Sequence, residues 1–328
     1  ATDVFKLVIG QQDFQRGAVV ALLLLAPALL TFGVDRLVAA KQTSALSARA
    51  VPYRPKRVPW FDRLMTGYCA FIAFLMLAML GMAVFASFAS FWPYNLAPSL
   101  RNYDFDHMDG GGWATYFNSL RMALGTALVG SAVAFAIAWL VDKPRHAGLL
   151  RDGLNLVATL PLAVPGLALG LGYILFFNDP ANPLRGLYGT MAILIACTVA
   201  HFLSVAHLTM VAALRQLDRE YELVGESLGV APWFTAWRVH LPVCLPALLE
   251  VAGYFFVNAM TTVSAVVFLY APHTQLASVA VLNMDDAGDM APAAAMAVLI
   301  FVTAGAARLL FALASRWLLA RTQRWRQR

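Results

Sequence analysis

Long runs without a charged side chain are the feature that most constrains this chain. No Asp, Glu, Lys or Arg occurs between Gly153 and Phe177, or between Val251 and Met284. A charge at the centre of a bilayer costs at least about 2.5–3.5 kcal/mol on insertion scales. A helix of about 20 apolar residues is long enough to cross the hydrocarbon core. These runs therefore predict membrane-spanning helices and argue against a soluble enzyme.

The composition extends this conclusion to the whole chain of 328 residues. Hydrophobic residues make up 60% and charged residues 13%, whereas soluble domains have about 45–50% and about 25%. Seven segments are long and apolar enough to span, approximately Gly17–Val34, Leu64–Phe91, Phe117–Val141, Gly153–Phe177, Leu187–Leu214, Leu248–Ala271 and Ala291–Leu313. The sequence thus predicts an all-α polytopic membrane protein with about seven spanning helices.

The loops between these segments differ in charge, and the difference predicts their topology. Lys and Arg are enriched in cytoplasmic loops. One set of alternate loops, 35–63, 142–152, 215–247 and the C-terminal tail, contains eighteen basic residues. The other set, 92–116, 178–186 and 272–290, contains two. We therefore expect a multi-pass protein of the bacterial inner membrane with a cytoplasmic C-terminus. The net charge of +6 then marks topology and implies no nucleic acid.

The sequence has no signature of an enzyme or of a metal centre. None of its lysines follows a Gly-x4-Gly loop, so we expect no ATP site of the P-loop type. The cysteines Cys69, Cys197 and Cys244 lie far apart in the sequence. His201 and His207 are six residues apart, about 240° around a helix, so they do not share a face. We expect no catalytic residues, no metal ligands and no cofactor in this chain.

The cytoplasmic loop 215–247 is long for a connection in a helical bundle and has helical patterns of its own. Apolar residues at i, i+4, i+7 and i+11 define one helix face, Leu217, Tyr221, Val224 and Leu228. Asp218 is suited to cap the start of this helix, and Gly229 to end it in a left-handed conformation. The loop therefore predicts a short amphipathic helix before Gly229.

A second short helix is predicted to begin at Pro232, a residue suited to a first helical turn. It carries the aromatic residues Trp233, Phe234 and Trp237. We expect it to stop at Leu241-Pro242, because the residue before proline is pushed out of the helical region. Two short helices with exposed aromatic side chains favour docking on a protein. The alternative is an amphipathic helix that lies on lipid.

Gly229, followed nine residues later by Val239-His240-Leu241-Pro242, resembles the Gly-x9-Ile-x-Leu-Pro signature of ABC importer permeases. Val239 replaces the isoleucine. The family's Glu-Ala-Ala aligns with Leu223-Val224-Gly225, so its acidic position is not matched. Glu222 and Glu226 are the two candidates to replace it.

This resemblance implies a type I permease transmembrane domain whose loop forms a coupling helix on a cytoplasmic ABC ATPase dimer. ATP and Mg would bind to that partner. The residues that the resemblance assigns to coupling are Glu222, Glu226, Gly229, Pro232, Trp233, Phe234, Val239, Leu241 and Pro242. A periplasmic solute-binding protein would deliver the substrate to a pair of permease modules.

Three further segments are similar to parts of this family. Tyr116–Leu120 looks like the opening of the core transmembrane domain, and Leu160–Gly166 like its proline-broken third helix. Met260–Leu269 looks like the fifth helix of fused permeases in the ferric-iron and 2-aminoethylphosphonate branch. The resemblance therefore implies 2-aminoethylphosphonate as the substrate, with ferric iron, or another small anion or a polyamine, as the alternative.

An ion-coupled secondary transporter is the alternative of another class. Such a protein usually carries an acidic residue within the membrane. The predicted spans lack one, except for Glu250, which we expect at a cytoplasmic end.

The organisation into domains follows from a linker rich in Ala, Ser, Pro and basic residues. Residues 1–36 are interpreted as the last span of a preceding permease module, 37–63 as a cytoplasmic linker, and 64–328 as a six-helix module with its core at about 117–313. A weak repeat supports this reading, because Val4–Ala21 can be laid on Val279–Met296. We expect the natural protein to extend N-terminally through a first permease half.

Polar residues in the spans are candidates for the translocation path. They are Arg121, Asn258, Thr261, Thr262 and Ser264. The alternative is structural, because such groups also join helices by hydrogen bonds and an arginine near a helix end can snorkel to headgroups. Pro161, Pro165 and Gly166 predict a bend suited to a gate.

Overall fold

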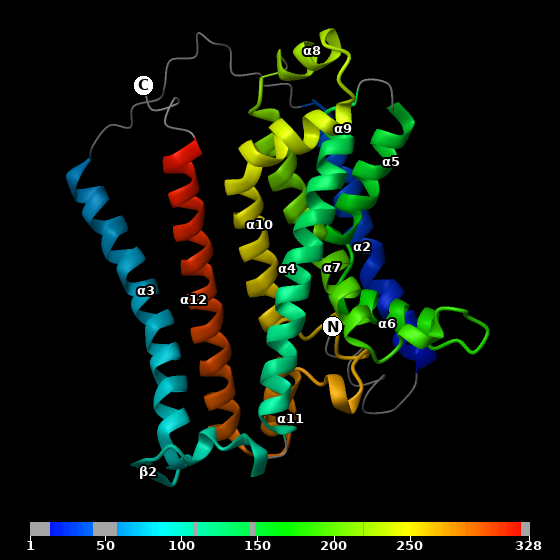
Figure 1. Cartoon of the computed structure of the whole chain (residues 1–328). Coiled ribbons are helices and arrows are strands. Elements are labelled where there is room, and N and C mark those ends of the chain that lie inside the picture. The colour runs from blue at the N-terminus through cyan, green and yellow to red at the C-terminus, as the bar shows by residue number, and fades with distance from the viewer. Residues whose placement is uncertain (1–13, 42–57, 108–109, 145–147, 219, 323–328) are drawn as a thin grey trace.

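The structure is a computed structural model that describes residues 14–41, 58–107, 110–144, 148–218 and 220–322 (Figure 1). The first helices and strands are α2 Phe14–Lys41, α3 Pro59–Phe88, β1 Ala89–Phe91, β2 Asn95–Pro98, α4 Gly112–Asp142, α5 Gly148–Thr159 and α6 Gly166–Phe177. They are followed by α7 Met191–Arg215, α8 Glu220–Ser227, α9 Pro232–Thr235, α10 Leu241–Thr261, α11 Ala277–Asp286 and α12 Met290–Thr322. Short 3-10 turns and the π-turn Ala236–His240 join several of these helices.

The all-α polytopic prediction is confirmed. Within the described residues, five helices are long and apolar enough to cross a membrane, or six if the bent pair α5–α6 counts as one span. The first predicted span in the chain, Gly17–Val34, falls within α2. The apolar stretch of that helix, Arg16–Pro27, is shorter than a full crossing. The helices α2 and α3 also enter the predicted linker 37–63 from both ends. The repeat is untested, since residues 1–13 lie outside the described part.

Small residues hold the core helices together. Along α4 the side chains that face α7 and α10 are almost fully buried, and they include Ala123, Ala127, Ala134 and Ala138. At Gly130 an added Cβ would lie 2.8 Å from the ring of Phe255 on α10. In lipid the apolar surface of a helix gains little by burial against another helix, so close approach through small residues is a main source of attraction.

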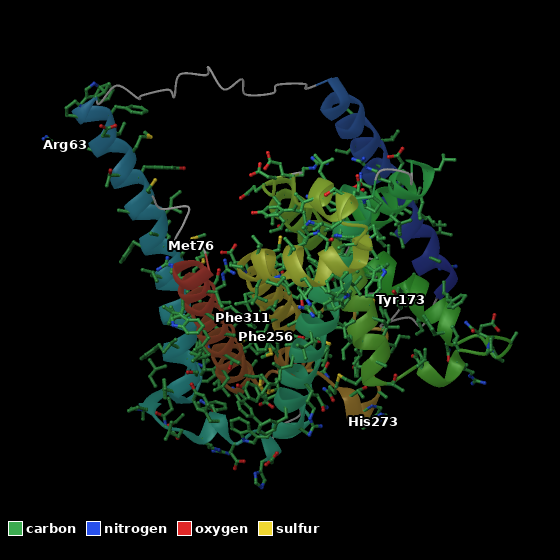
Figure 2. All side chains as sticks on the ribbon, turned by 45° about the horizontal axis from the view of Figure 1, so that its top comes forward. Arg63, Met76, Tyr173, Phe256, His273 and Phe311 are labelled. Atoms are coloured by element: carbon green, nitrogen blue, oxygen red, sulfur yellow. The ribbon has the colours of Figure 1, made fainter. Side chains whose placement is uncertain are left out.

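The remaining helices cover this core. The rings of Phe256 on α10 and Phe311 on α12 lie 6.3 Å apart between centroids and join these two helices (Figure 2). α3 packs on the outside of α12 and is exposed along nearly all its length, as at Met76 (Figure 2). α2 contacts α6 on the opposite side of the core. The exposed apolar surface of α3 suits a helix surrounded by lipid or by another membrane-spanning module.

The two ends of the bundle differ as the charge pattern predicts. α8, α9 and the described C-terminal end of α12 lie at one end of the molecule (Figure 1). The β1–β2 hairpin and α11 lie at the other end (Figure 1). Loops predicted to be cytoplasmic therefore share one end. Which end faces the cytoplasm stays a prediction.

The predicted span Leu248–Ala271 is wrong at both ends. The helix begins at Pro232, because α9, the π-turn and α10 are continuous, and it ends at Thr261. Leu241 keeps helical angles, so Leu241-Pro242 does not stop the helix as we expected. The π-turn explains this, because its wider hydrogen bond from Leu241 N–H to Ala236 O relieves the crowding that a proline ring causes in an α-helix.

Residues 262–271 form buried, irregular backbone. Three consecutive β-branched residues, Thr261 to Val263, begin this segment, and such residues fit a helix less well. Non-helical backbone is tolerated at membrane depth only where protein surrounds it. Here Leu269 and neighbouring side chains are fully buried, and the Thr262 carbonyl accepts a hydrogen bond of 2.6 Å from Ser278 Oγ.

The contact between Gly130 and Phe255 gives a test of the core. Gly130→Ala should lower the free energy of unfolding by about 1–3 kcal/mol, because the buried ring has to move. The control is Gly81→Ala on α3, where no atom lies within 4 Å of the added Cβ. The measurement is thermal unfolding in detergent, and equal melting temperatures for the two variants would contradict the packing.

Candidate functional site

The end of α8 has the geometry predicted from Gly229. Gly229 adopts φ +67°, in the left-handed region. Its N–H donates to Glu226 O at 3.1 Å, and Val230 N–H donates to Gly225 O at 2.9 Å. These two bonds form a Schellman motif, which satisfies the last carbonyls of a helix and reverses the chain. Pro232 then begins α9, as predicted.

A buried polar cluster fastens α8 to the ends of α4 and α10. Glu222 Oε1 lies 2.8 Å from Lys143 Nζ and 3.3 Å from His240 Nε2. Trp139 Nε1 donates to His240 Nδ1 at 3.0 Å. The proton of a neutral His240 is therefore on Nε2, facing the Glu222 carboxylate. The side chains of Lys143 and His240 are only 6% and 1% exposed, so little solvent screens the ion pair. We call these four residues the α8 brace.

The two acidic candidates of the loop have different surroundings. Glu222 points into the α8 brace, whereas Glu226 is exposed on α8. Both line a cavity of about 330 Å³ between α8, α9 and the end of α4. The sequence offered no signal for the Lys143–Glu222 pair, because the two residues lie far apart in the chain.

The other predicted coupling residues form a largely exposed surface. α8 has no buried residue. Of the predicted apolar face, Tyr221, Val224 and Leu228 are exposed, Leu228 by 72%, whereas Leu217 lies before α8 and packs against the core. Trp233 is 64% exposed and Phe234 42%, and the Arg238 guanidinium lies 5.0 Å from the Phe234 ring centre. Val239 and Leu241 are half-buried, and Pro242 is exposed. We call the exposed face of α8 and α9 the coupling surface.

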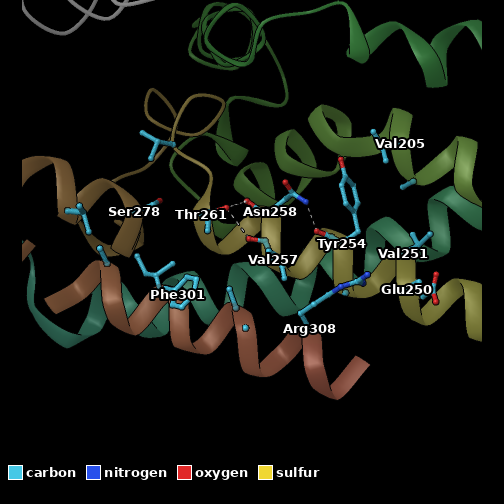
Figure 3. Close-up of a pocket in the computed structure, with 18 of the residues that line it drawn as sticks. Val205, Glu250, Val251, Tyr254, Val257, Asn258, Thr261, Ser278, Phe301 and Arg308 are labelled. Atoms are coloured by element: carbon cyan, nitrogen blue, oxygen red, sulfur yellow. Dashed lines mark hydrogen bonds between the residues drawn. The ribbon is translucent and has the colours of Figure 1, made fainter. Parts of the chain in front are cut away.

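Two of the five predicted path residues line one large groove. Asn258 and Thr261 lie in a cavity of about 920 Å³ between α7, α10, α11 and α12 (Figure 3). Thr262 is buried beside it, Ser264 lies against Gly166 of α6, and Arg121 is exposed on α4 away from it. The expected residues Thr262, Ser264 and Arg121 therefore do not line this groove.

The groove also contains polar residues that the sequence did not lead us to expect there. They are Glu250, Tyr254, Ser278 and Arg308. Glu250 is not at the end of its helix as expected, because the helix begins at Pro232 and not near Leu248. Arg308 lies within the predicted span Ala291–Leu313. A charged residue in such an apolar run was the signal available in the sequence.

A sharp break lies at the residues predicted to form a bend. The helical segments Gly148–Leu162 and Gly166–Phe177 meet at 112°. The irregular segment 262–271 fills the space beside α6, where a Cβ at Gly170 would lie 2.6 Å from Ala265 O. Glycine at this position therefore permits the contact between α6 and the irregular segment. A role for Pro161, Pro165 and Gly166 as a gate stays a prediction.

The fold and the two surfaces define a class of protein, a multi-pass helical membrane domain with exposed loop helices at one end and a groove between its helices that contains polar residues. A family model covers more than half of the chain, residues 130–319. The chain belongs to this family, the binding-protein-dependent transport system inner membrane components. It is therefore an inner-membrane permease of the ABC importer kind, and this family is not itself enzymatic.

The names of several curated relatives give one of two substrates. The ferric transport system permease protein FbpB of Actinobacillus pleuropneumoniae is 31% identical over 67% of this chain and 32% of its own length. A putative 2-aminoethylphosphonate transport system permease protein, PhnV of Salmonella paratyphi A, is 26% identical over 61% of this chain and 73% of its own length. The chain thus spans about a third of the ferric relative.

Solved structures agree on the fold. A bacterial ABC transporter that imports the acidic polysaccharide alginate matches with a TM-score of 0.63 at 15% identity. The match covers 78% of this chain and 94% of that one. At this identity the likeness shows the fold alone.

The α8 brace gives a prediction about local stability. Lys143→Glu should free α8, because it places a second carboxylate beside Glu222 in a poorly solvated site. A charge-assisted contact contributes about 1.5–3 kcal/mol, so the amides of α8 should exchange about 10- to 100-fold faster. Hydrogen exchange of the purified protein in detergent measures this.

The double variant Lys143→Glu/Glu222→Lys serves as the rescue, since it restores opposite charges, and slow exchange should return. Arg151→Glu on the exposed surface of α5 is the matched charge control. Unchanged exchange in Lys143→Glu would refute the role of the ion pair.

Proposed function

We propose that this chain is the transmembrane permease part of an ATP-driven importer and that its coupling surface binds a cytoplasmic ABC ATPase. The observation that carries this proposal is the exposed apolar and aromatic face of α8 and α9, fastened by the α8 brace to α4 and α10. A partner that pushes on this surface moves both core helices. ATP and Mg belong to the partner in this proposal.

The charge of α8 favours a protein over lipid at this surface. Glu220, Glu222 and Glu226 are the charged residues of the helix, and all are acidic. The cytoplasmic leaflet carries negative charge and attracts basic segments. An acidic helix with exposed apolar residues is therefore better matched to a protein groove with basic residues. Among the described residues from α8 to the π-turn, the exposed Arg238 is the one basic residue.

Further partners follow from the family. One solved alginate importer with this fold was crystallised with a substrate-bound periplasmic protein. We propose that a periplasmic solute-binding protein likewise delivers substrate to this permease, on the side of the β1–β2 hairpin and α11. A second permease module completes the path, and residues 1–36 belong to the end of such a module, fused N-terminally. The C-terminus is then cytoplasmic.

We propose 2-aminoethylphosphonate as the substrate, with ferric iron as the alternative. The similarity to PhnV over most of that relative supports the first, and the similarity to FbpB supports the second. The relatives alone support both equally.

Coupling is tested at Gly229 and Trp233. Gly229→Leu and Trp233→Ala should both uncouple ATP hydrolysis from uptake, the first by straining a left-handed turn and the second by removing an exposed anchor. Uptake by the complex in liposomes should fall at least tenfold while the ATPase remains active. Gly229→Asn is the matched control, since asparagine tolerates this conformation.

Full ligand-stimulated uptake by both Gly229→Leu and Trp233→Ala would refute the coupling proposal. Uptake by the wild-type permease without any ATPase would instead support an ion-coupled transporter.

The substrate is tested with a periplasmic solute-binding protein that is first shown to bind this permease. We expect calorimetry to show binding of 2-aminoethylphosphonate and none of ferric ion. Binding of ferric ion alone would reverse our choice of substrate.

A further inference from the structure

Two opposite charges face the groove from different helices. Glu250 lies on α10 and Arg308 on α12, and both line the cavity of about 920 Å³. Figure 3 shows Arg308 extending from α12 toward α10, near Tyr254 and Val251, with Glu250 one turn further along α10. None of the ion pairs between described residues includes either of them.

Both charges lie within long apolar helices, and both side chains are exposed. Glu250 follows Leu241, where α10 begins after the π-turn, by nine residues, about 14 Å along a helix at 1.5 Å per residue. Arg308 precedes Leu319 by 11 residues, about 16 Å. Charged residues are rare at such depth, face a protein interior or a water-filled cavity, and mark pathways for substrates. An unpaired acid and base in one groove therefore call for a ligand or a partner that satisfies both.

The polar lining of the groove matches a small molecule that carries both charges. Asn258, Thr261 and Ser278 add amide and hydroxyl groups along the same groove. A guanidinium has a fork of N–H donors that fits a phosphonate or carboxylate, and the Glu250 carboxylate is suited to an ammonium group. Since only one side chain of each sign is present, binding would be weak enough to allow release, as transport requires.

A bare ferric ion fits this groove less well. Glu250 and Tyr254 offer it two oxygen ligands, but the positive charge of Arg308 faces the same space. No group of three or more His, Cys, Asp or Glu side chains that could hold a metal ion occurs among the described residues. The groove chemistry thus separates two substrates that the relatives leave equal.

We propose that Glu250 and Arg308 form a transient site for a small zwitterion in the translocation groove. Arg308 binds its anionic end and Glu250 its ammonium. This proposal rests on the function proposed above, because it assumes that the groove is part of the path. It assigns the positive charge of the path to Arg308 and not to Arg121.

The test uses the full-length permease with its ATPase and binding protein in liposomes, and labelled 2-aminoethylphosphonate as the probe. Arg308→Gln and Glu250→Gln should each lower uptake at least tenfold in complexes that assemble as the wild type does. Arg316→Gln is the control, because Arg316 is exposed on the same helix outside the groove. It should keep wild-type uptake.

Each other outcome overturns the site in a distinguishable way. Wild-type uptake by both glutamine variants would refute the site and leave the proposed function intact. Loss of the assembled complex in these variants would make the two residues interface charges that pair with the second module. Wild-type uptake of ferric citrate but not of the phosphonate would exclude a zwitterion. Absence of any ATP-driven uptake by the wild type would overturn the proposed function and the site together.

Discussion

Close packing of small side chains along α4 is the interaction on which the rest of the structure depends. A bilayer removes most of the hydrophobic gain between helices, so van der Waals contact at short distance has to hold them. The buried alanines of α4 and the contact of Gly130 with Phe255 provide that contact to α7 and α10. The α8 brace and the groove both depend on this core. The α8 brace attaches to the end of α4, and the groove opens between α7, α10 and the helices α11 and α12.

The sequence predicted those parts of the fold that follow from solvation or from local geometry. Charge-free runs identified the spans, because a bilayer excludes charge, and Gly229 identified the end of α8, because its conformation is local. It did not predict where α10 ends. There the chain leaves the helix in an apolar stretch, and the irregular backbone is stabilised by burial against α6 and by the Ser278 hydrogen bond. These contacts come from distant residues and leave no mark on hydrophobic periodicity.

In the candidate sites, too, local features were predictable from the sequence and contacts between distant residues were not. The exposed aromatic residues of α9 were predicted because a short loop helix has few ways to bury them. The pairing of Glu222 with Lys143 depends on how α8 folds back on α4, which no local pattern contains. Arg308 is a different case, since one charge in an apolar helix is visible in the sequence. Its meaning appears only when α12 and α10 are seen to share a groove with Glu250.

The continuous stretch of α9, the π-turn and α10 joins the coupling surface to the groove. We expected Leu241-Pro242 to separate a docking helix from a spanning helix, but one helical element runs from Pro232 to Thr261. Trp233 at one end and Asn258 near the other therefore lie on the same element, with the π-turn and Pro246 between them. Non-helical backbone begins after this element, at Thr262. A separate break lies between α5 and α6. A change between two packings has to bend at such places, because helices transmit motion and irregular segments absorb changes in backbone angle.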